Sequence, residues 1–211
     1  MRLIVLTAAL VLSACSARPA PPSAETQQRP FPDIGGRTVM LLPVQLVLPV
    51  IGTTATTDTT QRPAPLPQAA LVVLESELSY WLTGRTPRTR WVTPESVVRA
   101  AAGAPALAVR PRELPVQDFL RASLQSIGDP LYGDLRKLGI LVDARVALLP
   151  IGAVWVPELG GGGRVHIAAA LIDTFGGNVL WYGVVAGDTG SRSDAGTAAS
   201  AAQALAQVIP R

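Results

Sequence analysis

AAALIDTFGGNVLW, residues 168–181, is the stretch of this sequence that decides the fold, because it predicts a β-hairpin late in the chain. Apolar residues lead up to a polar, glycine-containing centre and resume after it. Strands are therefore expected over residues 164–174 and 178–186. Gly176-Gly177 is typical of a hairpin turn, because glycine accepts a positive φ without a steric penalty.

The hairpin also predicts where particular side chains lie. Asp173 can cap the turn through its carboxylate, and Leu180 and Trp181 are expected on opposite faces of the second strand, with Trp181 buried. Among the four tryptophans of the chain, we expect Trp155 at the surface, because it stands beside Pro157 and a run of glycines. Exposed tryptophans often anchor protein interfaces, so Trp155 is the candidate partner contact.

The rest of the chain predicts helices packed on one sheet. The continuous apolar run at residues 38–44 is typical of a strand covered on both faces. Further strands are expected over residues 90–92 and 144–150, the latter continuing through 154–156 after a bend at Gly152. Helices are expected over residues 67–82, 93–102, 116–126, 131–138 and 194–208. This order predicts a mixed α/β fold: a single sheet with helices packed on it, a late β-hairpin and a C-terminal helix.

The first of these helices has a regular apolar face. Leucines recur there at intervals of three and four residues, at Leu71, Leu74, Leu78 and Leu82. This spacing places them on one side of a helix and predicts that they face the sheet. Glu75 and Glu77 are expected on the solvated side.

The N-terminus predicts export and lipid attachment. Met1-Arg2 and the apolar residues 3–12 precede Leu12-Ser13-Ala14-Cys15. A charged start, a short apolar core and a small-residue cleavage site are typical of a secretory signal peptide, and the apolar run is too short to span a bilayer permanently. Leu12-Ser13-Ala14-Cys15 resembles the bacterial lipobox, which implies cleavage before Cys15 and attachment of acyl chains such as palmitate to its thiol. The alternative is an ordinary secretory signal with a cysteine at the cut by chance.

Composition predicts three parts: a lipoprotein signal peptide at 1–14, a lipidated flexible tether at 15–36 and an α/β domain at 37–211. Residues 16–32 are rich in Pro, Ala, Ser and Gln and have little to bury, which favours a disordered tether. A Thr-, Pro- and Gln-rich stretch at 52–67 predicts a mobile loop. Cys15 is the only cysteine, so no intramolecular disulfide is possible.

The charge of the chain argues against a nucleic-acid-binding protein. The formal net charge is +3, charged residues make up 16% of the chain, and Lys137 is the only lysine. The arginines are scattered, with one mild cluster at Arg85, Arg88 and Arg90, which we interpret as solvated surface. Nucleic-acid binding favours a concentrated basic stripe, and none is evident.

No pattern of catalytic, cofactor-binding or metal-binding residues is recognisable. His166 is the only histidine, whereas a zinc site needs several His or Cys ligands and a serine triad needs a nucleophile elbow. The glycines at 160–163 precede Arg164 and a strand pattern rather than the lysine and helix of a phosphate loop, which favours a hairpin connection. The acidic residues lack the spacing of a calcium loop; they include Asp129, Asp134, Asp143 and Asp173. We therefore expect no cofactor and no enzyme activity.

Three segments together resemble a family of bacterial envelope lipoproteins. They are the apolar strand at 39–43, residues 144–150 and the hairpin at 168–181. In this order they are similar to the α/β domain of lipoproteins related to the curli-secretion lipoprotein, the lipoprotein activators of penicillin-binding proteins and the N-terminal domain of TolB. The resemblance covers about residues 37–209 and implies a fold with helices on one sheet; it implies no shared catalytic residues.

These observations predict a non-enzymatic outer-membrane lipoprotein that faces the periplasm. Ser16, rather than an aspartate, follows the lipidated cysteine, which favours the outer membrane in the common sorting rule. We expect the chain to bind another envelope protein as an accessory or assembly factor, with the membrane contacted through the lipid on Cys15. A hydrolase of envelope polymers and an oligomeric secretion-channel component are the alternatives, and the oligomeric state stays open.

Overall fold

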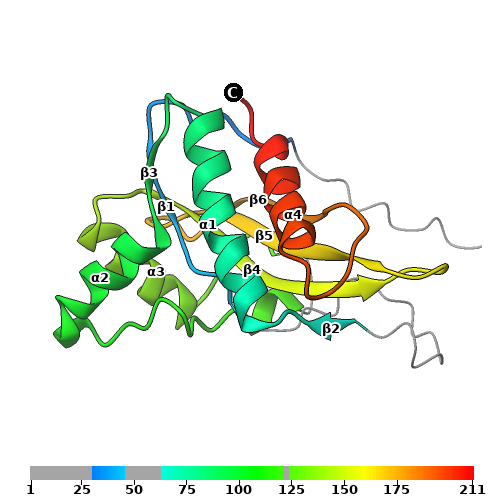
Figure 1. Ribbon diagram of the computed structural model, residues 1–211. Coiled ribbons are helices and arrows are strands. Elements are labelled where there is room, and N and C mark those ends of the chain that lie inside the picture. The colour runs from blue at the N-terminus through cyan, green and yellow to red at the C-terminus, as the bar shows by residue number, and fades with distance from the viewer. Residues whose placement is uncertain (1–29, 46–62, 121–123) are drawn as a thin grey trace, which may run out of the picture.

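A computed structural model describes residues 30–45, 63–120 and 124–211 and confirms the mixed α/β fold (Figure 1). The strands are β1 (Thr38–Leu41), β2 (Ala64–Pro65), β3 (Arg90–Val92), β4 (Val146–Pro157), β5 (Gly163–Asp173) and β6 (Val179–Ala186). The helices are α1 (Gln68–Arg85), α2 (Pro94–Ala102), α3 (Leu131–Leu141) and α4 (Ala195–Val208), with short 3-10 turns η2 (Pro105–Leu107) and η3 (Gln117–Leu120).

The strands form one sheet in the order β3-β1-β4-β5-β6, with β2 paired to β4 off this path. β3, β1 and β4 are parallel, and Val39 of β1 pairs with Trp91 on one side and Val146 on the other. β4, β5 and β6 are antiparallel. β1 has neighbours on both edges and helices on both faces, which explains its continuous apolar sequence.

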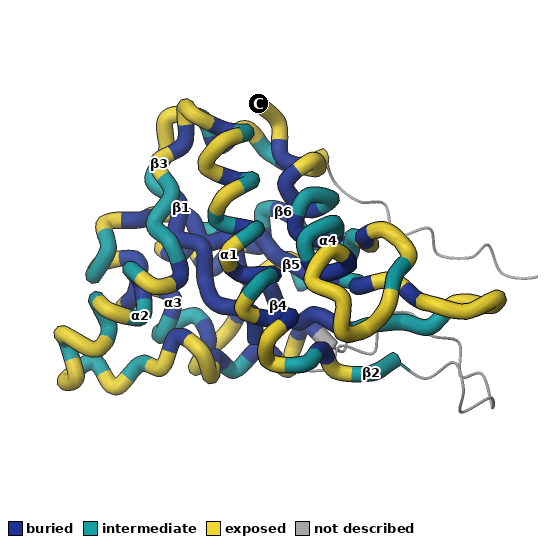
Figure 2. The backbone as a smooth tube through the Cα atoms, in the orientation of Figure 1, coloured by how far each residue is buried: buried dark blue, intermediate teal, exposed yellow. Residues whose placement is uncertain are grey.

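Helices cover the two faces of the sheet (Figures 1 and 2). α1 and α4 pack on one face and bury Val39 and Leu41 of β1 together with Leu148 of β4. α2 and α3 pack on the other face, where Met40 and Leu149 are buried. Alternate residues of β1 thus enter different apolar clusters, as the pleat of a strand requires.

The leucine face of α1 and the residues that begin α2 and α4 have the roles that the sequence predicts. Leu71, Leu74, Leu78 and Leu82 of α1 are all buried. The Thr93 side chain accepts a hydrogen bond from the Ser96 N–H at the start of α2, with Pro94 in the first helical turn. Asp194 caps α4 in the same way by accepting from the Gly196 N–H at 3.0 Å. Side-chain acceptors at these positions satisfy N–H groups that have no partner inside the helix.

The helix predicted over residues 116–126 is wrong. Residues 116–126 contain only the 3-10 turn η3, and residues 121–123 lie outside the described residues. Ser126 instead forms an isolated bridge with Asn178, and the Ile127 N–H donates to the Gly177 carbonyl at 2.8 Å. Pairing with the turn of the late hairpin requires an extended backbone here, and tertiary contacts of this kind override a weak helical pattern.

The expectation that Glu75 is solvated is also wrong, because only 7% of Glu75 is exposed. Its carboxylate accepts a hydrogen bond from the Val44 N–H at 3.0 Å, just beyond the end of β1. Arg112 donates to both oxygens of the same carboxylate at 3.1–3.2 Å. Glu75 therefore satisfies a buried backbone donor and is itself neutralised by an arginine, two conditions under which a buried carboxylate is tolerated.

The hairpin has the predicted turn but an unforeseen bulge. The Asp173 carboxylate accepts from the Phe175 N–H at 3.0 Å, and Gly177 has a φ of 68°. Leu171 pairs with Trp181 and Ile172 with Val179, so Leu180 is an extra residue in β6. The extra residue interrupts the alternation of the strand, and Leu180 and Trp181 both pack against the cluster under α1 and α4. The expectation that they face opposite sides is therefore wrong.

β4 and β5 are joined by the glycine-rich segment that the sequence assigned to a hairpin connection. β4 is one strand with a register shift between Pro150 and Gly152, where the bend was expected. The connection turns through three glycines with positive φ, at Gly160, Gly161 and Gly162. Leu159 at its tip is 89% exposed.

The core begins before the expected domain start at residue 37. Phe31 and Ile34 are buried, and Phe31 lies with its ring centre 5.1 Å from that of Trp181. The signal peptide, Cys15 and most of the expected tether lie outside the described residues, as do residues 52–62 of the expected loop. The end of that loop is structured, because Ala64–Pro65 form β2 and Leu66 is buried. Among the described helices, none is both long and apolar enough to cross a membrane.

Candidate functional site

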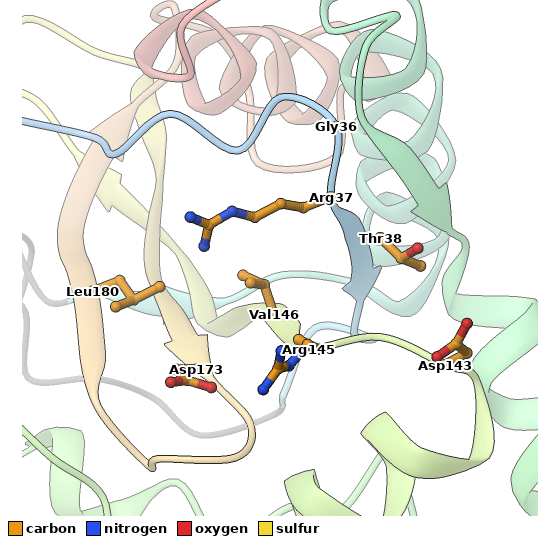
Figure 3. A pocket seen from close by; sticks show the side chains of 8 residues that line it. All are labelled: Gly36, Arg37, Thr38, Asp143, Arg145, Val146, Asp173 and Leu180. Atoms are coloured by element: carbon orange, nitrogen blue, oxygen red, sulfur yellow. The ribbon is translucent and has the colours of Figure 1, made fainter.

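The first candidate is a cavity of about 520 Å³ at one end of the sheet (Figure 3). It lies where β1 and β4 begin, β5 ends and β6 starts. Its charged side chains are Arg37, Arg145, Asp143 and Asp173, and its apolar surface includes Leu180. Nothing in the sequence groups these two aspartates, which are 30 positions apart and line one cavity only because β4 pairs with β5.

The formal charges in the lining of this cavity balance, because it includes two arginines and two aspartates. Arg145 stacks over the Phe175 ring with its guanidinium carbon 5.0 Å from the ring centre, which fixes the direction of its side chain. Asp173 already serves the hairpin turn by accepting from the Phe175 N–H. A balanced site of this kind favours neither an anion nor a cation, and no grouping of metal-ligating side chains occurs in the described parts of the chain.

The second candidate is a cleft of about 630 Å³ at the C-terminal end of α1. We call it the α1 cleft; it is lined by Tyr80, Trp81, Gly84, Arg85, Pro87, Arg88 and Arg211. Figure 1 shows that the end of α1 lies close to the C-terminal end of the chain, which brings Arg211 to the same place. Tyr80 is 69% exposed, and its ring meets that of Trp81 edge to face at 5.5 Å between centres.

The guanidinium groups of the α1 cleft are not engaged in ion pairs. None of the salt bridges found between described residues includes Arg85, Arg88 or Arg211. The Arg85 Nε is buried without a hydrogen-bond partner in the described structure. The solvated-surface interpretation of the arginine cluster therefore missed a cleft, whereas Arg90 lies outside the lining. Trp81 and Arg85 lie on the last turns of α1 and Arg88 in the turn after it, so their closeness was visible in the sequence, whereas the approach of Arg211 was not.

Trp155 does not occupy the exposed position expected from the sequence. It is half-buried and packs against the core under α1 and α4. Its neighbours in the sheet are Ala64 and Val165, and a Cβ added at Gly163 would lie only 2.6 Å from its ring. None of the four tryptophans is fully exposed, and Trp181 is buried as expected. A partner contact at Trp155 remains a prediction.

His166 is half-buried in β5 between Val154 and Ala186 of the neighbouring strands. Burial lowers the pKa of His166 from its ordinary value of 6.5, the positive charge of Arg164 lowers it further, and Glu158 opposes this shift. Arg164 and Glu158 are themselves paired at 2.7 Å. His166 is therefore neutral at pH 7, and its surroundings are those of a strand residue rather than of a catalytic base.

Comparison with known proteins yields no matching family model and no matching curated protein. Solved structures align over most of the chain at low identity. The PelC dodecamer from Paraburkholderia phytofirmans is 14% identical, covering 86% of this chain and 94% of PelC with a TM-score of 0.39. The LpoB C-terminal domain from Salmonella enterica is 13% identical, covering 73% of this chain and 84% of that domain with a TM-score of 0.38. Lipoprotein GNA1162 from Neisseria meningitidis is 12% identical, covering 75% of this chain and 84% of its own with a TM-score of 0.36.

Proposed function

We propose that this chain is a lipid-anchored protein of the bacterial envelope that acts by binding another envelope protein, at the periplasmic face of the outer membrane. The observation that carries this proposal is Leu12-Ser13-Ala14-Cys15 after a short apolar run. Acyl chains on Cys15 would hold the protein at the membrane, since each buried methylene group contributes about 0.8 kcal/mol. Ser16 supports the outer membrane as the destination.

The described core limits how far the domain can stand from its anchor. Phe31 is already buried, so residues 16–30 are what separates the lipidated cysteine from the folded part. A chain of this length spans at most about 50 Å when fully extended. The domain would therefore act within this distance of the membrane surface, where its partners would be membrane proteins or other envelope components.

An accessory role is supported by the α1 cleft. Tyr80, Trp81 and the neighbouring arginines gather there at the surface. Tyrosine, tryptophan and arginine are the residue types most enriched at the energetic centres of protein interfaces. A surface of this composition favours protein binding.

Lipidation is tested by metabolic labelling with an alkyne fatty acid in the native host. Cys15→Ala should abolish the label and leave an uncleaved or mislocalised precursor, whereas Ser16→Ala, which keeps the cysteine, should label normally. Ser16→Asp should move the protein to the inner-membrane fraction of a sucrose gradient. A Cys15→Ala variant that is labelled as strongly as the parent chain would end the lipoprotein proposal.

One observation favours the alternative of a hydrolase acting on envelope polymers. Asp143 and Asp173 line the same cavity from opposite sides (Figure 3), and glycoside hydrolysis uses two carboxyl groups that flank the bond to be cleaved. Release of soluble fragments from purified envelope polysaccharide, lost in both Asp143→Asn and Asp173→Asn, would establish the hydrolase. The accessory role predicts no release by the parent chain. Asp173→Asn also removes a charge from the turn, so the Asp143 variant is the cleaner comparison.

A further inference from the structure

We propose that the α1 cleft is a docking site for an acidic peptide segment of a partner protein. The segment would place carboxylates against Arg85, Arg88 and Arg211 and an apolar side chain against Tyr80 and Trp81. This inference names the chemistry of the partner and rests on the proposed binding function, although the binding itself can be measured without reference to the lipid anchor.

Charge complementarity is the first argument. The three guanidinium groups of the α1 cleft have no ion-pair partner in the described structure, unlike Arg112 and Arg164, which are paired at 3.1 Å and 2.7 Å. The guanidinium group presents its donors in a planar fork that matches a carboxylate, and such pairs are stronger than neutral hydrogen bonds. The unpaired cleft arginines therefore form a site for carboxylate groups.

One carboxylate of the described chain, that of Asp33, lies near the cleft without forming an ion pair with its arginines. Asp33 lies close to Arg88 across Gly35, but its Oδ1 accepts a hydrogen bond from the Gly35 N–H at 2.8 Å. No salt bridge between Asp33 and Arg88 forms in the described structure. The lining of the cleft thus differs from that of the cavity in Figure 3, which includes two aspartates as well as two arginines.

The aromatic side chains provide the second argument. Tyr80 projects from α1 with 69% of its surface exposed, and Trp81 supports it from the edge. Rings of this kind give a large contact area and lose little rotamer freedom on binding. Pro87 makes the turn after α1 rigid, because its ring fixes φ. The lining of the cleft therefore combines aromatic rings with guanidinium groups.

A peptide fits these dimensions better than the other polyanions of a bacterial cell. Nucleic-acid binding requires basic residues spread along a stripe that follows many phosphates. An anionic membrane surface requires a broad basic face or a basic amphipathic helix. Here the free arginines converge on one recess of about 630 Å³, which suits a short segment with a few side chains.

Fluorescence anisotropy tests the proposal with the full chain, acylated or not, in a non-ionic detergent. The probe is a fluorescein-labelled octapeptide of glutamates with one central leucine, and the reference probe replaces every glutamate by glutamine. We expect the glutamate peptide to bind, the glutamine peptide to bind at least about tenfold more weakly, and affinity to fall as salt is raised.

Variants locate the binding site. Arg88→Ala should weaken binding about tenfold, as expected for the loss of a charge-assisted hydrogen bond, and Tyr80→Ala should weaken it severalfold. The matched control is Arg99→Ala, which removes an equally exposed arginine from α2 and should change affinity less than about twofold. Both cleft residues are exposed, so thermal melts should show that each variant remains folded.

Three outcomes would overturn the docking site. The glutamate and glutamine peptides could bind equally, Arg99→Ala could weaken binding as much as Arg88→Ala, or an oligothymidine or anionic vesicles could bind through Arg88 more tightly than the peptide. None of these results depends on acylation of Cys15. A failure of the docking site is therefore distinguishable from a failure of the lipoprotein proposal, which the labelling of Cys15→Ala decides.

Discussion

Phe31→Ala tests whether the folded domain begins within the segment that composition assigns to the tether. Phe31 is only 8% exposed, and its ring lies 5.1 Å from Trp181 at an interplanar angle of 51°. Trp181 in turn is 2% exposed and belongs to the cluster under α1 and α4. If residues 30–36 were a tether, removal of the Phe31 ring would leave stability unchanged.

The structure predicts a clear loss instead. Replacing a buried phenylalanine by alanine costs roughly 3–5 kcal/mol of unfolding free energy. Phe31 lies at the N-terminal edge of the core, where the backbone can relax, so we expect the low end, about 3 kcal/mol. For a domain of this size each kcal/mol shifts the melting temperature by roughly 2–4 °C, which predicts a drop of about 6–12 °C.

Urea and thermal melts of Phe31→Ala, Trp181→Ala and the double variant form a double-mutant cycle. An aromatic pair in contact should show a coupling energy of about 0.5–1.5 kcal/mol. Phe175→Ala is the matched control, because Phe175 is 40% exposed and its substitution should cost less than about 1 kcal/mol. A Phe31→Ala melt that coincides with that of Phe175→Ala, or strictly additive single variants, would refute the packing of the N-terminal segment.

Three further predictions concern buried groups that the sequence placed at the surface or left without a role. Glu75→Ala leaves a buried backbone N–H without its acceptor and should cost about 1–3 kcal/mol in urea melts, while Glu77→Ala should stay within about 0.5 kcal/mol. Trp155→Ala should cost at least about 1 kcal/mol of unfolding free energy because the ring packs on the core. A melt unchanged from that of the parent chain, together with weakened partner capture, would instead support Trp155 as an exposed partner contact. His166 has a lowered pKa in the folded chain, so the unfolded chain takes up its proton first and stability should fall as the pH drops below 6.5. NMR of this single imidazole should also show a higher pKa in Arg164→Ala, and an unchanged value would contradict the role of that charge.

Patterns that repeat along one element were sufficient to predict most of the fold. The leucine spacing defines α1, the Thr93-Pro94 start defines α2, and the glycines after residue 173 define the late hairpin. In each case the residues that specify the element lie within it. The segment at 116–126 failed because its apolar residues serve an irregular connection whose partner, the turn at Gly177, lies some fifty residues away.

The candidate sites could be predicted only in part, because they depend on contacts between distant segments. Glu75 has the sequence neighbours of a solvated residue and is buried only because the Val44 N–H needs an acceptor. The α1 cleft combines residues at the end of α1 and in the turn after it, which are neighbours in the sequence, with Arg211, which α4 brings close because it packs beside α1 on the same face of the sheet. Cys15 is the opposite case. Its lipidation is predicted from local sequence alone, and the residue lies outside the described residues.

The N-terminal segment and the α1 cleft are physically connected, which bears on how an anchored protein would present the cleft. The Gly36 N–H donates to the Arg88 carbonyl at 2.8 Å, and the Thr89 hydroxyl donates to the Ile34 carbonyl at 3.2 Å. The same segment is held at its other end by Phe31 on Trp181. The chain that would lead to the lipid is thus fixed to the loop that carries a cleft arginine. An anchor at Cys15 would therefore join the domain through the same segment that contacts the cleft loop, and the residues before Phe31 would set the distance of the domain from the membrane.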